Sequence, residues 1–185
     1  ETNRSLAEQA VLETGLGNVE DKIIKNHRKT LGLLRDLKNT PSCGIIRELP
    51  EQGLVEIARP VGVVGAVTPS TNPIATPLNK TLNALKGRNA IILAPSPKGE
   101  AVCQRVVDLL QNVLRRSGLP ENLIQKLSTP VSKEATHELM HLVDLIVVTG
   151  SQNNVRASYR SGTPAIGVGA GNVSTLIDET ADLVS

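Results

Sequence analysis

Hydrophobic and polar positions follow two different patterns in the first third of the chain. From Arg4 to Lys38, apolar side chains recur every three or four residues, which is the period of an amphipathic helix. The segment Gly15-Leu16-Gly17-Asn18 interrupts this pattern, so we predict two helices, the second capped by Asn18. Residues 43–58 alternate instead and contain two glycines, which favours a β-hairpin or a pair of edge strands.

From residue 61 onward, short and almost continuous aliphatic runs alternate with amphipathic stretches. This rhythm predicts strands separated by helices, in the order 61–68, 72–85, 89–95, 99–116, 122–128, 132–142, 144–150, 153–160 and 164–169. Strands of this kind are typical of a parallel sheet covered on both faces. With right-handed crossovers the fold class is α/β, a doubly wound parallel sheet. We therefore divide the chain into N-terminal helices (1–42), a β-ribbon (43–60) and an α/β domain (61–185).

The loops after the predicted strands carry the candidate chemistry, because the carboxyl ends of parallel strands meet at one edge of the sheet. All five loops combine proline or glycine with hydroxyl or amide side chains, which suits a crevice for a phosphate-bearing ligand. In chain order they contain Thr68, Pro69, Ser70, Thr71, Asn72 and Pro73; Ala94, Pro95, Ser96, Pro97 and Lys98; Thr129 and Pro130; Thr149, Gly150 and Ser151; and residues 167–172, which begin with Gly167, Val168 and Gly169.

Composition removes several classes of function. The 20 basic and 18 acidic residues leave no broad field that would recruit nucleic acid or a membrane surface. Tyr159 is the only aromatic residue besides histidine, so the chain lacks stacking platforms for bases, and we expect no nucleic-acid partner. No apolar run approaches the ~20 residues that cross a bilayer. Two cysteines and no charged-then-apolar leader favour a cytoplasmic protein.

The sequence HELMH, residues 137–141, has the spelling of a zinc-peptidase helix. It falls in the predicted helix 132–142, whose sheet-facing side we expect to be Ala135, Leu139, Leu142 and Val143. The extended metallopeptidase pattern requires glycine at 144 and histidine at 147, where this chain has Asp144 and Val147. We therefore predict no metal site, with a zinc peptidase kept as a remote alternative.

Several segments together resemble one enzyme family. In order and with compatible spacing they are ETGLGNVEDKIIKN, VTPSTNP, NAIILAPSPKG, VVTGS and SGTPAIGVGAGNV. This set resembles the cofactor half of the aldehyde dehydrogenase family, and most closely its CoA-acylating branch. That branch includes dehydrogenases for sulfoacetaldehyde and succinate semialdehyde and the aldehyde dehydrogenase half of bifunctional aldehyde-alcohol dehydrogenases. The resemblance implies a Rossmann-like sheet that binds NAD or NADP without a GxGxxG turn after its first strand.

By this resemblance, Thr68, Pro69 and Ser70 line the crevice near the nicotinamide and pyrophosphate. Residues 94–98 lie by the adenosine ribose, and Gly150 and Ser151 open a helix that faces the phosphates. Pro97 stands where hydrolytic relatives often carry an acid, so a 2′-phosphate is tolerated and the choice between NAD and NADP stays open.

Two crevice residues bear on the reaction. Asn72 matches the asparagine that donates to the thiohemiacetal oxygen in this family, although an asparagine before Pro73 also suits a helix N-cap. Gly167 matches the position of the glutamate that activates water in the hydrolytic branch, although a glycine there also permits close packing. The resemblance therefore implies transfer of the acyl group to coenzyme A: aldehyde + CoA + NAD(P)+ gives acyl-CoA + NAD(P)H.

The nucleophilic thiol of the family lies in a second domain that follows the cofactor half. We expect Cys103 to be buried and Cys43 to lie far from the crevice, so neither replaces that thiol. The chain alone should then be inactive as an oxidoreductase. The resemblance also implies a homo-oligomer, dimeric or tetrameric. The alternative is a nucleotide-binding module without catalysis.

Overall fold

The computed structural model describes residues 2–169, 171 and 174–182. Two helices, α1 (Thr2–Thr14) and α2 (Val19–Lys38), begin the chain. Asn18 caps α2 as predicted, since its side-chain oxygen accepts a hydrogen bond of 2.9 Å from the backbone N–H of Asp21. Leu6 and Ala10 of α1 are buried against the α/β unit, so the first helix is part of its core packing.

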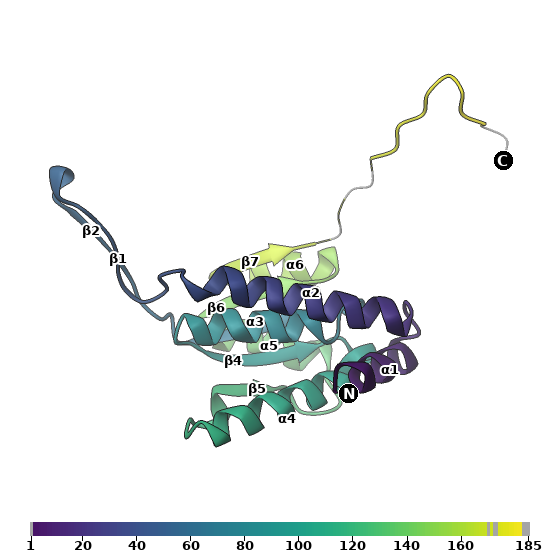
Figure 1. The fold of residues 1–185 in the computed structure, drawn as a ribbon, viewed down its shortest axis with the longest axis horizontal. Helices are drawn as coiled ribbons and strands as arrows, with labels where there is room; N and C mark the ends of the chain where they lie inside the picture. The colour runs from purple at the N-terminus through teal and green to yellow at the C-terminus, as the bar shows by residue number, and fades with distance from the viewer. Residues whose placement is uncertain (1, 170, 172–173, 183–185) are drawn as a thin grey trace.

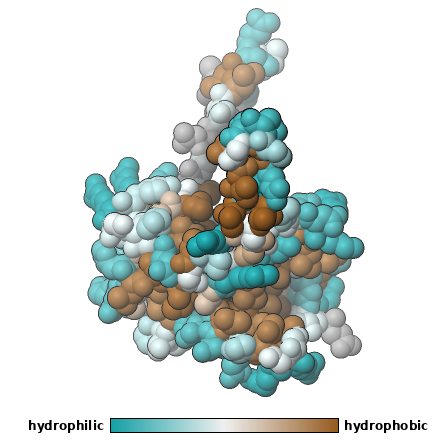
Figure 2. All heavy atoms as spheres, turned by 90° about the vertical axis from the view of Figure 1, so that its left-hand side faces the viewer, coloured by the Kyte–Doolittle hydropathy of each residue, from teal (hydrophilic) through white to brown (hydrophobic). Residues whose placement is uncertain are grey.

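The predicted β-ribbon is an antiparallel pair, β1 (Gly44–Leu49) and β2 (Leu54–Ala58). The two strands are joined by a short 3-10 helix, η1 (Pro50–Gln52), and by Gly53, which has a φ of 63°. The ribbon projects from the body of the molecule (Figure 1). Figure 2, viewed from the ribbon side, shows apolar side chains gathered along it.

Five parallel strands form the central sheet, as the rhythm from residue 61 predicts. They are β3 (Val63–Thr68), β4 (Ala90–Pro95), β5 (Ile124–Lys126), β6 (Leu145–Thr149) and β7 (Ala165–Val168). The spatial order is β5-β4-β3-β6-β7. Strand β5 is shorter than predicted because the 3-10 helix η3 (Glu121–Leu123) takes up its first residues.

Helices cover both faces of this sheet, which confirms the doubly wound α/β fold (Figure 1). Helices α3 (Ala75–Lys86) and α4 (Glu100–Arg116) pack on one face, with η2 (Pro97–Gly99) leading into α4. Helices α5 (Lys133–Leu142) and α6 (Gln152–Arg160) pack on the other. Side chains of β3 point to both faces of the sheet: Val64 packs in the core on the α4 side, and Val67 packs in the core on the α5 side. Among the described helices, none combines the length and apolarity needed to span a membrane.

One predicted core position on α5 is wrong. Leu139 and Val143 are buried, but Leu142 is 75% exposed and Met140, at 2%, takes its place. Successive helical residues are rotated by about 100°, so Leu139, Met140 and Val143 cluster around one direction while Leu142 lies roughly 100° away from its centre. The buried face of α5 is therefore rotated toward Met140 and away from Leu142, relative to the face that the sequence suggested.

This correction can be tested with two matched leucines on one helix. Leu139→Ala should lower the free energy of unfolding by about 2–5 kcal/mol, because it leaves a cavity in a closed core. Leu142→Ala should change it by no more than about 0.5 kcal/mol, as expected for an exposed position. Urea unfolding of both variants measures the two values; equal losses would show that the buried face of α5 is misassigned.

Candidate functional site

The strand order creates a crevice at the carboxyl edge of the sheet. From β3 the chain first moves to β4 and β5 on one side, and then returns to β6 and β7 on the other. Loops that diverge at such a reversal leave space between them. Here the space is a cavity of about 890 Å³, and residues after β3, β4 and β6 lie in its wall together with residues of α5 and α6.

Most of the predicted site residues lie in this wall. The structure brings together residues 68–72, 94–97 and 149–151 and Gly169. Other predicted residues are not in the wall. Lys98 is exposed on η2, Gly167 faces α6, and Val168 is exposed on the edge strand. The wall also does not include the loop residues Pro73, Thr129, Pro130 and Gly171. Residues 170 and 172 of the last predicted loop lie outside the described residues.

The structure adds wall residues that the sequence analysis missed. They belong to the first two turns of α5 and α6, to the cap of α5 and to the residue before that cap: Val131, Ser132, Lys133, Thr136, His137, Asn153, Asn154 and Ala157. A signal was available, because each helix starts directly after a loop at this edge. The sequence prediction named only loop residues, but the first turn of a helix that follows such a loop also lies at the crevice.

Asn72 and Thr68 carry buried side-chain oxygens in the cavity wall that have no protein partner. The side-chain oxygens Asn72 Oδ1 and Thr68 Oγ1 are buried without a hydrogen bond. Asn72 does not cap α3, since that helix begins at Ala75 with Ile74 at the cap position and no side-chain cap. The N-cap alternative is therefore wrong. Because buried polar groups nearly always have partners, these two atoms fit a ligand that supplies hydrogen-bond donors or a mobile hydroxyl.

Ser151 caps the N-terminus of α6, which lies in the cavity wall. Its hydroxyl accepts a hydrogen bond of 3.3 Å from the backbone N–H of Asn154, so Ser151 is the N-cap of α6, the helix that Gly150 and Ser151 were expected to open. Ser151, Asn153 and Asn154 all lie in the cavity wall. Free N–H groups and the positive end of the helix dipole favour a phosphate at this point.

Close packing brings the β3 and β4 loops together. A Cβ added to Gly99 would lie 2.7 Å from Cβ of Pro73, so only glycine allows the start of α4 to contact the loop that carries Asn72. Gly167 is also a packing glycine, because an added Cβ would lie 2.9 Å from Val155 Cγ1. The backbone N–H of Gly167 donates to the Tyr159 hydroxyl at 3.2 Å. The close-packing interpretation of Gly167 is confirmed, and its relation to water stays a prediction.

Lys80 lies beneath the crevice floor and was missed by the sequence analysis. Its ammonium donates to the backbone oxygens of Val67, at 2.7 Å, and Val147, at 2.6 Å, and so connects α3 to β3 and β6. Burial lowers the pKa of Lys80 from 10.5 to about 7. The sequence gives little sign of this, because a lysine inside an amphipathic helix normally faces water.

Neither cysteine lies in the cavity wall. Cys103 is fully buried in the core of α4, and burial raises the pKa of its thiol to about 12, so it is not a nucleophile. Cys43 precedes the ribbon and donates from Sγ to the backbone oxygen of Gly87, 3.5 Å away. Gly87 precedes β4, at the opposite end of the sheet from the crevice. Both expectations from the sequence are confirmed.

The HELMH segment, residues 137–141, lies along α5. His137 contributes to the crevice wall, whereas Nδ1 of His141 lies 3.0 Å from the backbone oxygen of Ser161. In the part of the chain that the structure describes, no three His, Cys, Asp or Glu residues gather in a group that could hold a metal ion. The zinc-peptidase alternative therefore has no ligand set there.

Comparisons with known proteins agree with this geometry. Residues 4–184 match the model of the aldehyde dehydrogenase family. A sulfoacetaldehyde dehydrogenase (acylating) from Cupriavidus necator is 60% identical over 181 residues, which are 98% of this chain and 37% of that protein. The chain thus spans less than two fifths of that relative's length.

Two solved structures with bound molecules are also similar. One is propionaldehyde dehydrogenase from Rhodopseudomonas palustris with bound CoA and an acylated cysteine, and the other is an engineered glycolyl-CoA reductase with bound NADP+. Each is 35% identical to this chain with a TM-score of 0.76, and each match covers 91% of this chain and 38% of the other. Coenzyme A is thus bound in the first of these two structures, and the second is named as a reductase of a CoA compound.

Lys80 provides a pH-dependent prediction. The folded-state pKa of about 7 lies below the ordinary value of 10.5, so the native chain binds fewer protons than the unfolded chain between these two values. Stability therefore increases with pH in that window. The free energy of unfolding of the wild type should rise relative to Lys80→Met from about pH 7 to about pH 10, and the difference should be constant below about pH 7.

Urea unfolding at a series of pH values measures this difference. Lys29→Met, an exposed position on α2, controls for the general effect of removing one positive charge. A difference between wild type and Lys80→Met that stays flat from neutral to alkaline pH would contradict the lowered pKa.

Proposed function

Because the chain belongs to the aldehyde dehydrogenase family, we propose that it is the cofactor-binding part of a CoA-acylating aldehyde dehydrogenase. The proposed reaction is aldehyde + CoA + NAD(P)+ giving acyl-CoA + NAD(P)H + H+. The aldehyde is oxidised, the dinucleotide accepts the hydride, and the thiol of CoA takes the acyl group. The similarity to an acylating sulfoacetaldehyde dehydrogenase and to a structure with CoA and an acylated cysteine supports this reaction.

The observation that carries the proposal is the crevice with its unpartnered polar atoms. Asn72 Oδ1 and Thr68 Oγ1 are buried in its wall near the start of α3, while the N-terminus of α6 lies in the wall beside β6. A dinucleotide supplies both of the matching features, an amide-bearing ring and a pyrophosphate. NAD(P) would be held by residues 68–71, 94–97 and 149–151, and when bound it supplies the hydride acceptor.

Asn72 is the residue of this chain that we place at the reacting atoms. When a thiolate attacks the aldehyde, the carbonyl oxygen becomes an oxyanion, and a fixed amide N–H stabilises it by about 3 kcal/mol. The side chain is held at the crevice by the turn before α3, where its backbone oxygen accepts from the N–H of Thr76 at 3.3 Å. This contact fixes the backbone of Asn72 at the crevice.

Transfer to CoA rather than water is supported by the residue at position 167, which lies on β7 beside the crevice wall. Gly167 has no side chain that could remove a proton from water, and an added Cβ would already contact Val155 and Tyr159. A thioester that water attacks slowly persists long enough to react with a second thiol. The attacking thiolate comes from outside this segment, because Cys103 is buried and Cys43 is distant from the crevice.

The β-ribbon supports a further part of the proposal, association with a second copy of the chain. Ile45 and Ile57 lie opposite each other on the two strands and are 58% and 55% exposed. Leu54 and Val55 add to this projecting apolar surface (Figure 2). An exposed apolar pair of strands that projects from the body is a suitable surface for binding another chain. We propose a homo-oligomer that uses this ribbon, in a cytoplasmic enzyme.

The reaction is tested by replacing Asn72 in the complete enzyme. Asn72→Ala should lower kcat for acyl-CoA formation by about 10²–10³-fold, with the KM for NAD(P)+ changed little. Asn79→Ala is the matched control, because Asn79 Oδ1 is also buried without a partner but does not lie in the cavity wall. Equal losses in the two variants would show that Asn72 acts through folding.

The same assay tests whether this chain is active without the rest of the enzyme, and which aldehyde is the substrate. The 185-residue chain alone should form no NAD(P)H from sulfoacetaldehyde or succinate semialdehyde with CoA, and the complete enzyme should form it with CoA present. Comparison of kcat/KM for the two aldehydes assigns the substrate. Free acid as the main product, at a rate independent of CoA, would overturn the acylating reaction.

Association through the ribbon is tested by sedimentation velocity. The double variant Ile45→Ser/Ile57→Ser should shift the protein toward smaller species, because it removes the apolar cross-strand pair. Arg47→Ala/Glu56→Ala, which removes an exposed ion pair on the same two strands, should sediment like the wild type. A wild-type protein that is monomeric, or an unchanged distribution in the isoleucine variant, would refute the role of the ribbon.

A further inference from the structure

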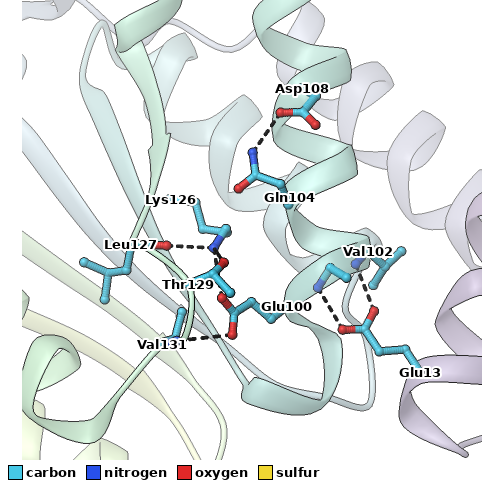
Figure 3. A network of polar contacts seen from close by, with 10 residues as sticks. Glu13, Glu100, Val102, Gln104, Asp108, Lys126, Leu127, Thr129 and Val131 are labelled. Atoms are coloured by element: carbon cyan, nitrogen blue, oxygen red, sulfur yellow. Dashed lines mark hydrogen bonds and ion pairs between the residues drawn. The ribbon is translucent and has the colours of Figure 1, made fainter.

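A buried charged pair lies directly behind one wall of the crevice. Glu100 opens α4 and Lys126 ends β5, and the ammonium lies 3.3 Å from Oε1 of the carboxylate (Figure 3). Their side chains are 11% and 2% exposed. Burying two charges is costly, and a buried pair often contributes little net stability compared with apolar residues of similar size. Its hydrogen bonds therefore indicate what the pair does.

All the remaining contacts of the pair reach a single loop. Glu100 Oε2 accepts from the backbone N–H of Val131 at 3.2 Å. The Lys126 ammonium donates to the backbone oxygen of Leu127, at 2.7 Å, and to the hydroxyl of Thr129, at 3.2 Å. Burial alone would raise the pKa of Glu100, but the hydrogen bonds from Thr129, Val131 and Lys126 outweigh it, so this pKa lies below its ordinary value. The carboxylate is thus ionised while it holds the loop.

That loop forms the crevice wall at the β5 side. Val131 is 7% exposed and lies in the cavity wall, followed by Ser132, which caps α5 by accepting from the N–H of Ala135 at 3.0 Å. Glu100 follows the β4 loop, residues 94–97, after only Lys98 and Gly99, and that loop forms the neighbouring wall. The pair therefore fixes the separation of the β4 and β5 walls.

The start of α4 is in turn held by the N-terminal helix. The Glu13 carboxylate of α1 accepts hydrogen bonds from the backbone N–H groups of Ala101 and Val102, at 2.8 and 2.9 Å (Figure 3). These bonds satisfy the first turn of α4 with a negative charge. Glu100 is therefore attached to a helix end that cannot shift freely, and movement of the loop depends on the pair.

We propose that Glu100 and Lys126 are positioning residues for the adenosine half of the bound dinucleotide. This inference rests on the proposed function. Asn72 marks the reacting end of the crevice, and the N-terminus of α6 suits the pyrophosphate, which leaves the β4 and β5 walls for the adenosine. These walls present Ala94, Pro95 and Val131, an apolar surface suited to a purine.

Binding of half-ligands to the chain tests the inference. Glu100→Gln and Lys126→Met should each weaken the affinity for ADP-ribose by about tenfold, because the wall is displaced, and leave that for nicotinamide mononucleotide within about twofold. Gln104→Ala is the matched control: Gln104 lies on the same helix and bonds only to Asp108, at 2.8 Å, away from the loop. Isothermal titration calorimetry measures the affinities of the wild type and of the three variants for both half-ligands.

A double variant separates positioning from stability. Glu100→Leu/Lys126→Met removes both charges together and should recover thermal stability relative to the single variants. It should still bind ADP-ribose weakly, because no group holds Val131. In the complete enzyme it should raise the KM for NAD(P)+ with kcat nearly unchanged.

The outcomes distinguish the two proposals. If the wild-type chain does not bind ADP-ribose, the proposed cofactor site is wrong. If the wild type binds it and the variants bind it equally well, the site stands and the positioning role is overturned. Weaker binding of both half-ligands to the same extent would also overturn it, because the effect would then be general.

Discussion

Parallel pairing is the constraint on which the rest of the structure depends. Five strands that run in one direction must end at one edge, and right-handed crossovers then place two helices on each face. Because β4 and β5 lie on one side of β3 while β6 and β7 lie on the other, the connections separate at β3 and leave the cavity open. Chemistry at this edge therefore needs no motif of its own, only suitable residues after each strand.

Polar groups on the two sides of the crevice wall differ in their hydrogen bonding. In front, Asn72 and Thr68 keep side-chain oxygens without protein partners. Behind the wall, Glu100 and Lys126 are buried and their hydrogen bonds go to one another and to the loop that carries Val131. An unsatisfied group is costly unless a ligand completes it, and a satisfied buried network is rigid. The wall thus combines a rigid hydrogen-bonded pair, Glu100 and Lys126, with two oxygens, on Asn72 and Thr68, that have no protein partner.

Strand and helix order could be predicted because they depend on hydrophobic period, which is local. Loop residues of the crevice could be predicted because parallel topology dictates which loops meet. Other features depend on rotation and packing, which a single sequence does not contain. Leu142 is exposed because the buried stripe of α5 is rotated toward Met140, and the partners of Lys80 and Glu100 come from strands distant in sequence. Asn72 suited a helix cap equally well until α3 was seen to begin at Ala75.

The central claim is that the carboxyl edge of this sheet binds a pyridine dinucleotide. Titration of the 15N-labelled chain with NAD+ and NADP+, followed by two-dimensional amide NMR, tests it most directly. The account predicts saturable shifts confined to residues 68–72, 94–97, 131–137 and 149–154, with the ribbon amides unchanged. Shifts that do not saturate, or that centre on the ribbon or on α2, would contradict it.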